Sequence, residues 1–171
     1  ESIPLYKKTI QIYSSWIEEK NLSLEKRELF EKLSLAHFNL GNAYYDLNRF
    51  QEAIKQYQMA IKYNPKDADA HLNLGLVYYE KNHLEKAIQE YKNVINLRPK
   101  DVSACNNLGL VYYKKGQIEK AILEYKKAIK INPEYTLAYN NLGMAYYEKG
   151  ESYKAIRQWK IPIRLFTSEV T

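Results

Sequence analysis

An all-α fold built from one repeating helix pair is predicted by the spacing of prolines and glycines in this chain of 171 residues. Three of the five prolines and four of the six glycines recur every 34 residues: Pro65, Pro99 and Pro133, and Gly41, Gly75, Gly109 and Gly143. Self-similarity at such a period indicates a stacked array of small units. The 17 tyrosines, beside four phenylalanines and two tryptophans, further indicate that one structural position is used repeatedly.

The segment before the repeats has a helical pattern of its own. Its apolar residues share one face up to Lys20, and Asn21-Leu22-Ser23 then breaks the pattern. We interpret residues 3–20 as an N-terminal capping helix, because the terminal units of a stacked array differ from the inner ones where they meet water. From Leu24 onward no glycine or proline interrupts the pattern, so the first helix of the first unit is expected to begin two turns or more upstream of Ser34.

The first helix of each unit carries the text Asn-Leu-Gly-x-x-Tyr-Tyr. A glycine inside a helix costs about 1 kcal/mol relative to alanine, so its recurrence predicts that a neighbouring helix approaches too closely for a Cβ. The expected counterpart of this glycine is the small alanine of the second helix, at Ala53, Ala87, Ala121 and Ala155.

The second helix of each unit carries that alanine and, four positions later, an aromatic residue: Tyr57, Tyr91, Tyr125 and Trp159. Proline donates no amide hydrogen and disfavours helical geometry in the residue before it, so Pro65, Pro99 and Pro133 are expected to end this helix in three of the units. In the fourth unit Pro162 falls inside the helix, which is therefore expected to stop or kink near Lys160.

These features resemble the tetratricopeptide repeat family, whose 34-residue helix-turn-helix has Leu-Gly-x-x-Tyr, alanine, an aromatic residue and proline at fixed offsets. The resemblance implies an all-α, right-handed α-solenoid of antiparallel helix pairs. It divides the chain into a cap and extended first helix at 1–33, four repeats at 34–67, 68–101, 102–135 and 136–164, and a tail at 165–171.

No catalytic motif is found, since the sequence lacks a Gly-rich phosphate loop, a Gly-x-Ser-x-Gly elbow, His-Glu-x-x-His and Cys-x-x-Cys. His37, His71 and Cys105 recur at one position of successive units and are residue types that zinc prefers. However, packed helices lie roughly 8 to 10 Å apart, whereas zinc ligands lie about 2.0 to 2.3 Å from the ion. We therefore expect this position to serve packing, and we expect no metal, no cofactor and no enzyme activity.

The net charge of +6 does not by itself indicate nucleic-acid binding. The largest local excess of lysines, in residues 114–130, is interrupted by Glu119 and Glu124, which is typical of solvated helix faces with local ion pairs. Nucleic acid is therefore not the expected partner. No apolar run approaches the roughly 18 residues of a membrane span. A single cysteine forms no internal disulfide, which favours a reducing compartment such as the cytoplasm.

The resemblance places a binding groove on the concave surface formed by the first helices. The column of Asn39, Asn73, Asn107 and Asn141 matches the asparagine ladder with which family members hydrogen-bond the backbone of an extended peptide. A side-chain amide offers one acceptor and two donors, which suit a peptide unit of any sequence. The alternative role for these asparagines is to tie neighbouring helices together.

Beside this asparagine column the groove is expected to be apolar and aromatic, as in many protein interfaces. The expected contact residues are Phe38, Leu72, Asn42, Leu76, Leu110, Met144, Tyr45, Tyr79, Tyr113 and Tyr147.

One known mode of binding in the family is not expected. Family members that clamp the C-terminal carboxylate of heat-shock chaperones use lysines and an arginine beside two asparagines. Asn42 and Asn73 match those asparagines, but the basic places hold Phe38, Ser103 and Asn107. Without cations a carboxylate would be desolvated unpaired, which is costly.

The sequence thus predicts a non-catalytic protein-protein interaction scaffold that binds an extended or helical polypeptide in its concave groove. Two alternatives are kept. The chain could be the recognition module of a larger enzyme or secretion assembly, or it could be a structural protein that self-associates through residues 161–171. In the second case the exposed apolar side chains would be Ile161, Ile163, Leu165 and Phe166.

Overall fold

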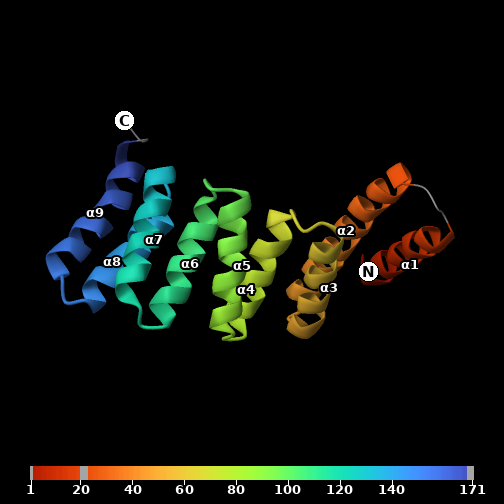
Figure 1. Ribbon diagram of the computed structural model, residues 1–171. Helices are drawn as coiled ribbons and strands as arrows, with labels where there is room; N and C mark the ends of the chain where they lie inside the picture. The colour runs from red at the N-terminus through yellow and green to blue at the C-terminus, as the bar shows by residue number, and fades with distance from the viewer. Residues whose placement is uncertain (1, 20–22, 169–171) are drawn as a thin grey trace. The chain divides into compact units, whose positions relative to one another are not determined.

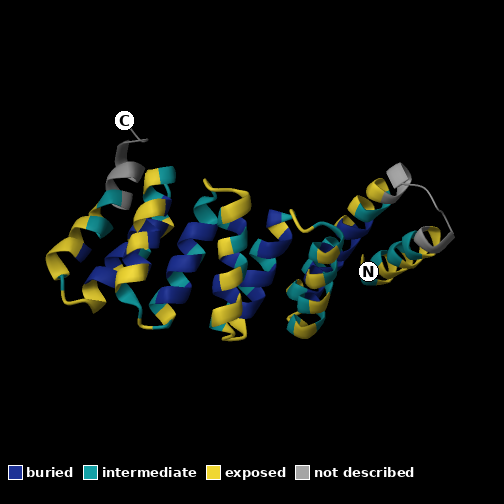
Figure 2. Ribbon diagram, in the orientation of Figure 1, coloured by how far each residue is buried: buried dark blue, intermediate teal, exposed yellow. Residues whose placement is uncertain are grey.

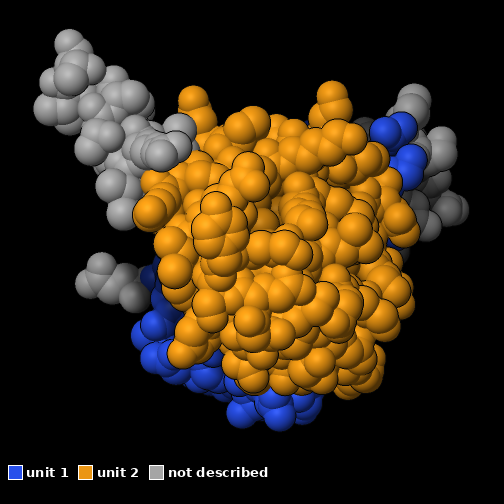
Figure 3. Space-filling model, turned by 90° about the vertical axis from the view of Figure 1, so that its left-hand side faces the viewer, with its two compact units in different colours: residues 1–83 blue, residues 84–171 orange. Residues whose placement is uncertain are grey.

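The computed structural model describes the backbone of residues 2–19 and 23–168 and the side chains of residues 2–16 and 27–161. Within these residues every regular element is an α-helix (Figure 1). The chain forms two compact units, residues 1–83 and residues 84–171, which Figure 3 draws in blue and orange. Each unit is described by itself below.

The N-terminal unit contains a run of helices in which each packs on the next: α1 on α2, α2 on α3 and α3 on α4. Their bounds are α1 Ser2–Glu19, α2 Ser23–Asp46, α3 Phe50–Tyr63 and α4 Ala68–Glu80. Helix α2 begins at Ser23, upstream of the repeat boundary at Ser34, and is longer than the other helices.

The C-terminal unit continues in the same manner, with α5 on α6, α6 on α7, α7 on α8 and α8 on α9. The bounds are α5 Leu84–Leu97, α6 Val102–Lys114, α7 Ile118–Ile131, α8 Thr136–Glu148 and α9 Ser152–Ser168. Figure 2 shows buried residues in dark blue along α6 and α8 and exposed residues in yellow along α7.

Helix ends follow the residues that the sequence places there. Helices α3, α5 and α7 end two residues before Pro65, Pro99 and Pro133, as predicted. At the start of α4 the carboxylate of Asp67 accepts hydrogen bonds from the backbone N–H of Asp69 and Ala70, at 3.1 and 3.0 Å. A side-chain oxygen at this position satisfies donors that have no partner inside the helix.

The turn inside each helix pair needs a left-handed residue. Asn48, Asn82, Gly116 and Gly150 occupy the same position of successive repeats and have φ values of 57°, 58°, 70° and 81°. Glycine and asparagine are the residues that adopt this conformation at least cost after a helix.

Gly41, Gly109 and Gly143 do lie at close approaches, but the counterpart is not the expected alanine. A Cβ added to Gly41 would lie 2.6 Å from Cε1 of Tyr57, and one added to Gly109 would lie 2.5 Å from Cε1 of Tyr125. At Gly143 the added atom would meet the indole of Trp159. The expectation of alanine was wrong because the large ring, four residues further along, lies across the glycine and fills the space that a Cβ would need.

The predicted stop of the last helix near Lys160 is also wrong, because α9 continues through Pro162 to Ser168, whereas the alternative of a kink there stays a prediction. Proline removes only its own amide donor, and the residues after it can still donate to carbonyls of the preceding turn. Ile161 is partly buried. The side chains of Ile163, Leu165 and Phe166 lie outside the described residues.

Candidate functional site

The amide side chain of Asn42 lies at the centre of a polar contact between the first two repeats. Its carbonyl oxygen accepts one hydrogen bond from the hydroxyl of Tyr57, at 2.8 Å, and another from the amide of Asn73, at 2.9 Å. Burial is the main reason that the pKa of the Tyr57 hydroxyl is raised well above its ordinary value, so this group remains a donor. The three side chains join α2, α3 and α4.

A second amide pair joins the last two repeats. The amide of Asn141 in α8 donates to the carbonyl oxygen of Asn106 in α6, at 2.8 Å. The contact between Asn106 and Asn107 is long, at 3.5 Å, so the side chain of Asn107 has no strong partner there.

Asn39, the first member of the predicted asparagine column, faces the N-terminal helix. One pocket of about 390 Å³ is lined by Ser2, Ile3, Tyr6, Asn39, Asn42, Ala43, Asp46 and Leu47. A second, of about 250 Å³, is lined by Leu5, Tyr6, Thr9, Tyr13, Lys32, Leu35, Ala36 and Asn39. Helix α1 therefore lies over the part of α2 that carries Asn39.

The four asparagines thus have different surroundings. Two of them, Asn73 and Asn141, each use one amide hydrogen to bind an asparagine of the preceding repeat. This is the helix-tying role that the sequence left as an alternative. Asn141 still carries a second N–H and a carbonyl oxygen for which the described part of the chain supplies no hydrogen-bond partner, whereas the side chain of Asn73 also contacts the Tyr57 hydroxyl.

The apolar residues predicted beside this column are partly accessible on the first helices. In the N-terminal unit these are Phe38, Leu72, Leu76, Tyr45 and Tyr79, and in the C-terminal unit Leu110, Tyr113, Met144 and Tyr147. The most exposed are Met144 at 48% and Tyr147 at 63%. The Tyr147 ring also contacts that of Trp159, with ring centroids 6.2 Å apart.

Two carboxylates that sequence reasoning missed lie beside the tyrosines of the N-terminal unit. Burial, followed by the charges of Glu80 and Asp46, raises the pKa of the Tyr45 hydroxyl. Burial and Glu80 likewise raise the pKa of Tyr79. Asp46 and Glu80 end α2 and α4 and are 34 residues apart, so the repeat period contained a signal for them.

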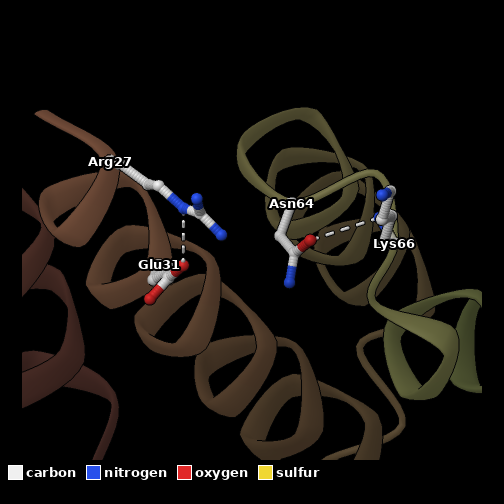
Figure 4. Close-up of polar contacts among 4 residues, drawn as sticks. All are labelled: Arg27, Glu31, Asn64 and Lys66. Carbon is white, nitrogen blue, oxygen red and sulfur yellow. Dashed lines mark hydrogen bonds and ion pairs between the residues drawn. The ribbon is translucent and has the colours of Figure 1, made fainter. Parts of the chain in front are cut away.

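The N-terminal unit also has a cleft where α2 extends past α3. It encloses about 590 Å³ and is lined by Arg27, Phe30, Glu31, Tyr63, Asn64, Pro65 and Lys66. Figure 4 shows its polar rim, where Arg27 Nε bonds Glu31 Oε1 at 3.4 Å and the backbone N–H of Lys66 donates to Asn64 Oδ1 at 3.2 Å. The repeat pattern does not reveal this cleft, because it depends on the length of α2.

His37, His71 and Cys105 share one position of the repeat, and each makes its own contacts with neighbouring residues. His37 stacks on Tyr63 with ring centroids 5.6 Å apart and bonds Gln56 Oε1 at 2.8 Å, while His71 Nε2 lies 3.3 Å from the carbonyl oxygen of Pro65. Cys105 is buried against Ala128 and Ala138, and burial raises the pKa of its thiol. Among the described residues, no three ligand-type side chains come together.

The excess positive charge belongs to the C-terminal unit. Residues 1–83 carry eleven basic and eleven acidic residues, and residues 84–171 carry fifteen and nine. Several of these lysines lie over tyrosine rings or pair with carboxylates. Lys120 lies 5.5 Å from the Tyr112 centroid, and Lys127 pairs with Glu124 at 2.7 Å. No helix of the described chain combines the length and the apolarity that a membrane span requires.

The comparisons with known proteins agree with this architecture. A family model described as "TPR repeat" matches residues 41–82, 75–116 and 109–150, so together the matches cover most of the chain. A search of curated proteins found no match.

Solved structures share the fold at low sequence identity. The structure titled "Crystal structure of MamA" has a TM-score of 0.78 at 24% identity and covers 96% of this chain and 91% of its own. YrrB, titled "a TPR protein with an unusual peptide-binding site", has a TM-score of 0.70 at 21% identity, covering 96% and 86%. The first TPR of Spaghetti (RPAP3), bound to the HSP90 peptide SRMEEVD, has a TM-score of 0.68 at 18% identity. This match covers 70% of this chain and 95% of that one. The predicted fold class, an all-α solenoid of helix pairs, is confirmed.

Proposed function

Because the chain belongs to the TPR repeat family, whose members are protein-interaction scaffolds, we propose that it binds a polypeptide along the first helices of its repeats. The contact residues would be those of the predicted groove, with the side-chain amides of Asn73, Asn107 and Asn141 bonding the peptide backbone. The binding carries no catalytic step.

One observation supports this proposal above the others. In α8, Met144 and Tyr147 are exposed apolar side chains at the positions where the sequence predicts contact, and Asn141 lies one turn before Met144. Large apolar side chains beside hydrogen-bonding groups are the usual composition of interface centres.

Site-specific photocrosslinking tests the proposal with a matched control. A benzophenone amino acid would replace Tyr147, and in a second variant Leu123 of α7, which is similarly exposed at 55% but lies on a second helix. Crosslinking in cell extract, followed by mass spectrometry, should attach a peptide at position 147 and not at position 123. Equal labelling at both positions, or none at 147, would contradict a site on the first helices.

The same groove chemistry argues against the carboxylate-clamp mode. The places that would hold the clamp cations carry Phe38, Ser103 and Asn107. A chaperone tail such as the one bound by RPAP3 would therefore meet no cation at those positions.

Self-association through the C-terminal end is a second candidate, favoured by the exposure of Ile156. This residue is 49% exposed, whereas Ile88 and Ile122, at the same repeat position, are each 8% exposed. The neighbouring Tyr153 is 84% exposed. Apolar surface left uncovered in this way favours association with a further chain.

Sedimentation of the full chain and of a variant lacking residues 161–171 tests this second candidate. We expect the apparent mass of the full chain to rise with concentration and the deletion to alter that rise. A monomer in both proteins across a hundredfold concentration range, roughly 1 to 100 μM, would rule out self-association at cellular concentrations.

A further inference from the structure

We infer that the inner face of residues 1–83 recognises a lysine or arginine side chain of the bound polypeptide, held by the carboxylates of Asp46 and Glu80 beside the ring of Tyr45. This inference rests on the proposed function and specifies the chemistry of the partner. It is carried by a pocket, by two carboxylates that form no ion pair within the described residues, and by the aromatic side chains around them.

The pocket lies where α2 and α4 present corresponding residues. It encloses about 180 Å³ and is lined by Asn42, Tyr45, Asp46, Tyr57, Asn73 and Leu76. Asp46 also lines the adjoining pocket of about 390 Å³ beneath the start of α1. None of the residues that line these two pockets is basic, so their only charged group is the carboxylate of Asp46.

Glu80 brings a second carboxylate to the same tyrosine. The charges of Glu80 and Asp46 both act on the Tyr45 hydroxyl and raise its pKa, and Glu80 acts on Tyr79 as well. Asp46 lines the pocket together with Tyr45, and Glu80 lies one turn after Leu76, which lines the same pocket from α4.

Neither carboxylate is neutralised by the described part of the chain, where no ion pair involves Asp46 or Glu80. The nearest base in sequence, Lys81, instead lies over the Phe50 ring, 6.0 Å from its centroid. Phe50 in turn packs on Tyr45 with ring centroids 5.8 Å apart. The carboxylates are therefore available to a cation from outside.

Carboxylates beside aromatic faces suit a guanidinium or ammonium group. The oxygens accept charge-assisted hydrogen bonds, and a tyrosine face attracts the cation through its quadrupole. An acidic peptide would be repelled at the same place. The corresponding positions of the C-terminal unit hold Lys114 and Glu148, which are opposite in sign and so give no such preference.

Peptide pools of defined central residue test the inference on the full chain. Three fluorescent nonapeptide pools are random except at the centre, which is arginine, alanine or glutamate, and binding is followed by anisotropy at low salt. We expect the arginine pool to bind at least about tenfold more tightly than the alanine pool, and the glutamate pool to bind weakest. The advantage of arginine should shrink at about 0.5 M salt.

Matched variants locate the effect. Asp46→Asn combined with Glu80→Gln should abolish the preference for arginine, and each single change should reduce it. Glu148→Gln removes the same charge from the same repeat position in the other unit and should leave the preference unchanged. The two carboxylates are exposed, and circular dichroism checks that each variant is folded.

The outcomes separate this inference from the proposed function. If the arginine and alanine pools bind equally well, or if Glu148→Gln has the effect of the double variant, the cation site is wrong while peptide binding stands. If no pool binds at millimolar concentration, both fail. A preference for the glutamate pool would overturn the inference directly.

Discussion

The side-chain amide of Asn73 donates a 2.9 Å hydrogen bond to the carbonyl oxygen of Asn42, so one predicted contact residue binds another. The same arrangement recurs between Asn141 and Asn106. Part of the asparagine column therefore contributes to stability before any partner arrives. A substitution in the column has to be chosen so that it separates stability from binding.

Asn107→Ala and Asn141→Ala provide that separation. Asn141→Ala removes a 2.8 Å hydrogen bond and leaves Asn106 without that donor, so we expect a loss of about 0.5 to 1.5 kcal/mol of unfolding free energy. Asn107→Ala removes only a 3.5 Å contact and should leave the denaturation curve unchanged while weakening peptide binding. Urea denaturation and peptide anisotropy measure the two effects. If Asn107→Ala lowers stability but not affinity, the column is structural.

Any side chain at Gly109 is expected to destabilise the folded protein. A methyl group there would lie 2.5 Å from the Tyr125 ring, which is fully buried and cannot move into solvent. Gly109→Ala should therefore cost about 1 to 3 kcal/mol, measured by urea denaturation. Combining it with Tyr125→Leu should recover part of the loss relative to Tyr125→Leu alone, since the clashing ring is gone. An unchanged midpoint for Gly109→Ala would contradict the close approach.

The buried side chain of Glu124 is expected to lower the stability of the folded protein. Its side chain is buried, its Oε1 pairs with Lys127 at 2.7 Å, and its Oε2 has no hydrogen-bond partner among the residues that the structure describes. Glu124→Met keeps the length and removes the unpartnered oxygen, so stability should rise by about 1 kcal/mol. Glu119→Met, at a well exposed position of the same helix, is the control and should be neutral. A clear loss for Glu124→Met would show that the pair with Lys127 is net stabilising.

Because of His37, the free energy of unfolding is expected to decrease in mild acid. Burial lowers the pKa of this imidazole, and the hydrogen bond with Gln56 opposes the shift only in part. The unfolded chain, with a pKa of about 6.5, therefore binds a proton before the folded chain does. Neutral His37 contributes fully to the stability of the folded protein above about pH 6.5. This contribution is lost as the pH falls through the lower pKa that His37 has in the folded protein.

Thermal melts across this pH range test the role of His37. His37→Tyr introduces the residue that repeat four carries at this position, Tyr139, and removes the titrating group. The variant should show a smaller drop in melting temperature than the parent between about pH 7.5 and 5.5. An identical drop in both proteins would place the acid sensitivity elsewhere.

The sequence determined the architecture because the same packing constraint appears at the same position of successive repeats. The period of 34 residues, the glycine in the first helix and the proline after the second were enough to predict helix pairs and three of the helix ends. A rule seen once could be chance, but a packing constraint that recurs at Gly41, Gly109 and Gly143 identifies a real contact. The family and the fold class followed from these local signals.

Tertiary structure alone decided what those positions touch. A column of equivalent asparagines looks uniform in sequence, yet Asn39 faces α1, Asn73 binds Asn42, and Asn107 makes only a long contact within the described part of the chain. These differences arise because each side chain meets residues from other helices, and the hydrogen-bond partner depends on the neighbour and not on the repeat. For the same reason the neighbour of the glycines is a ring and not an alanine, and Asp46 shares a pocket with Asn73 and Leu76 of another helix.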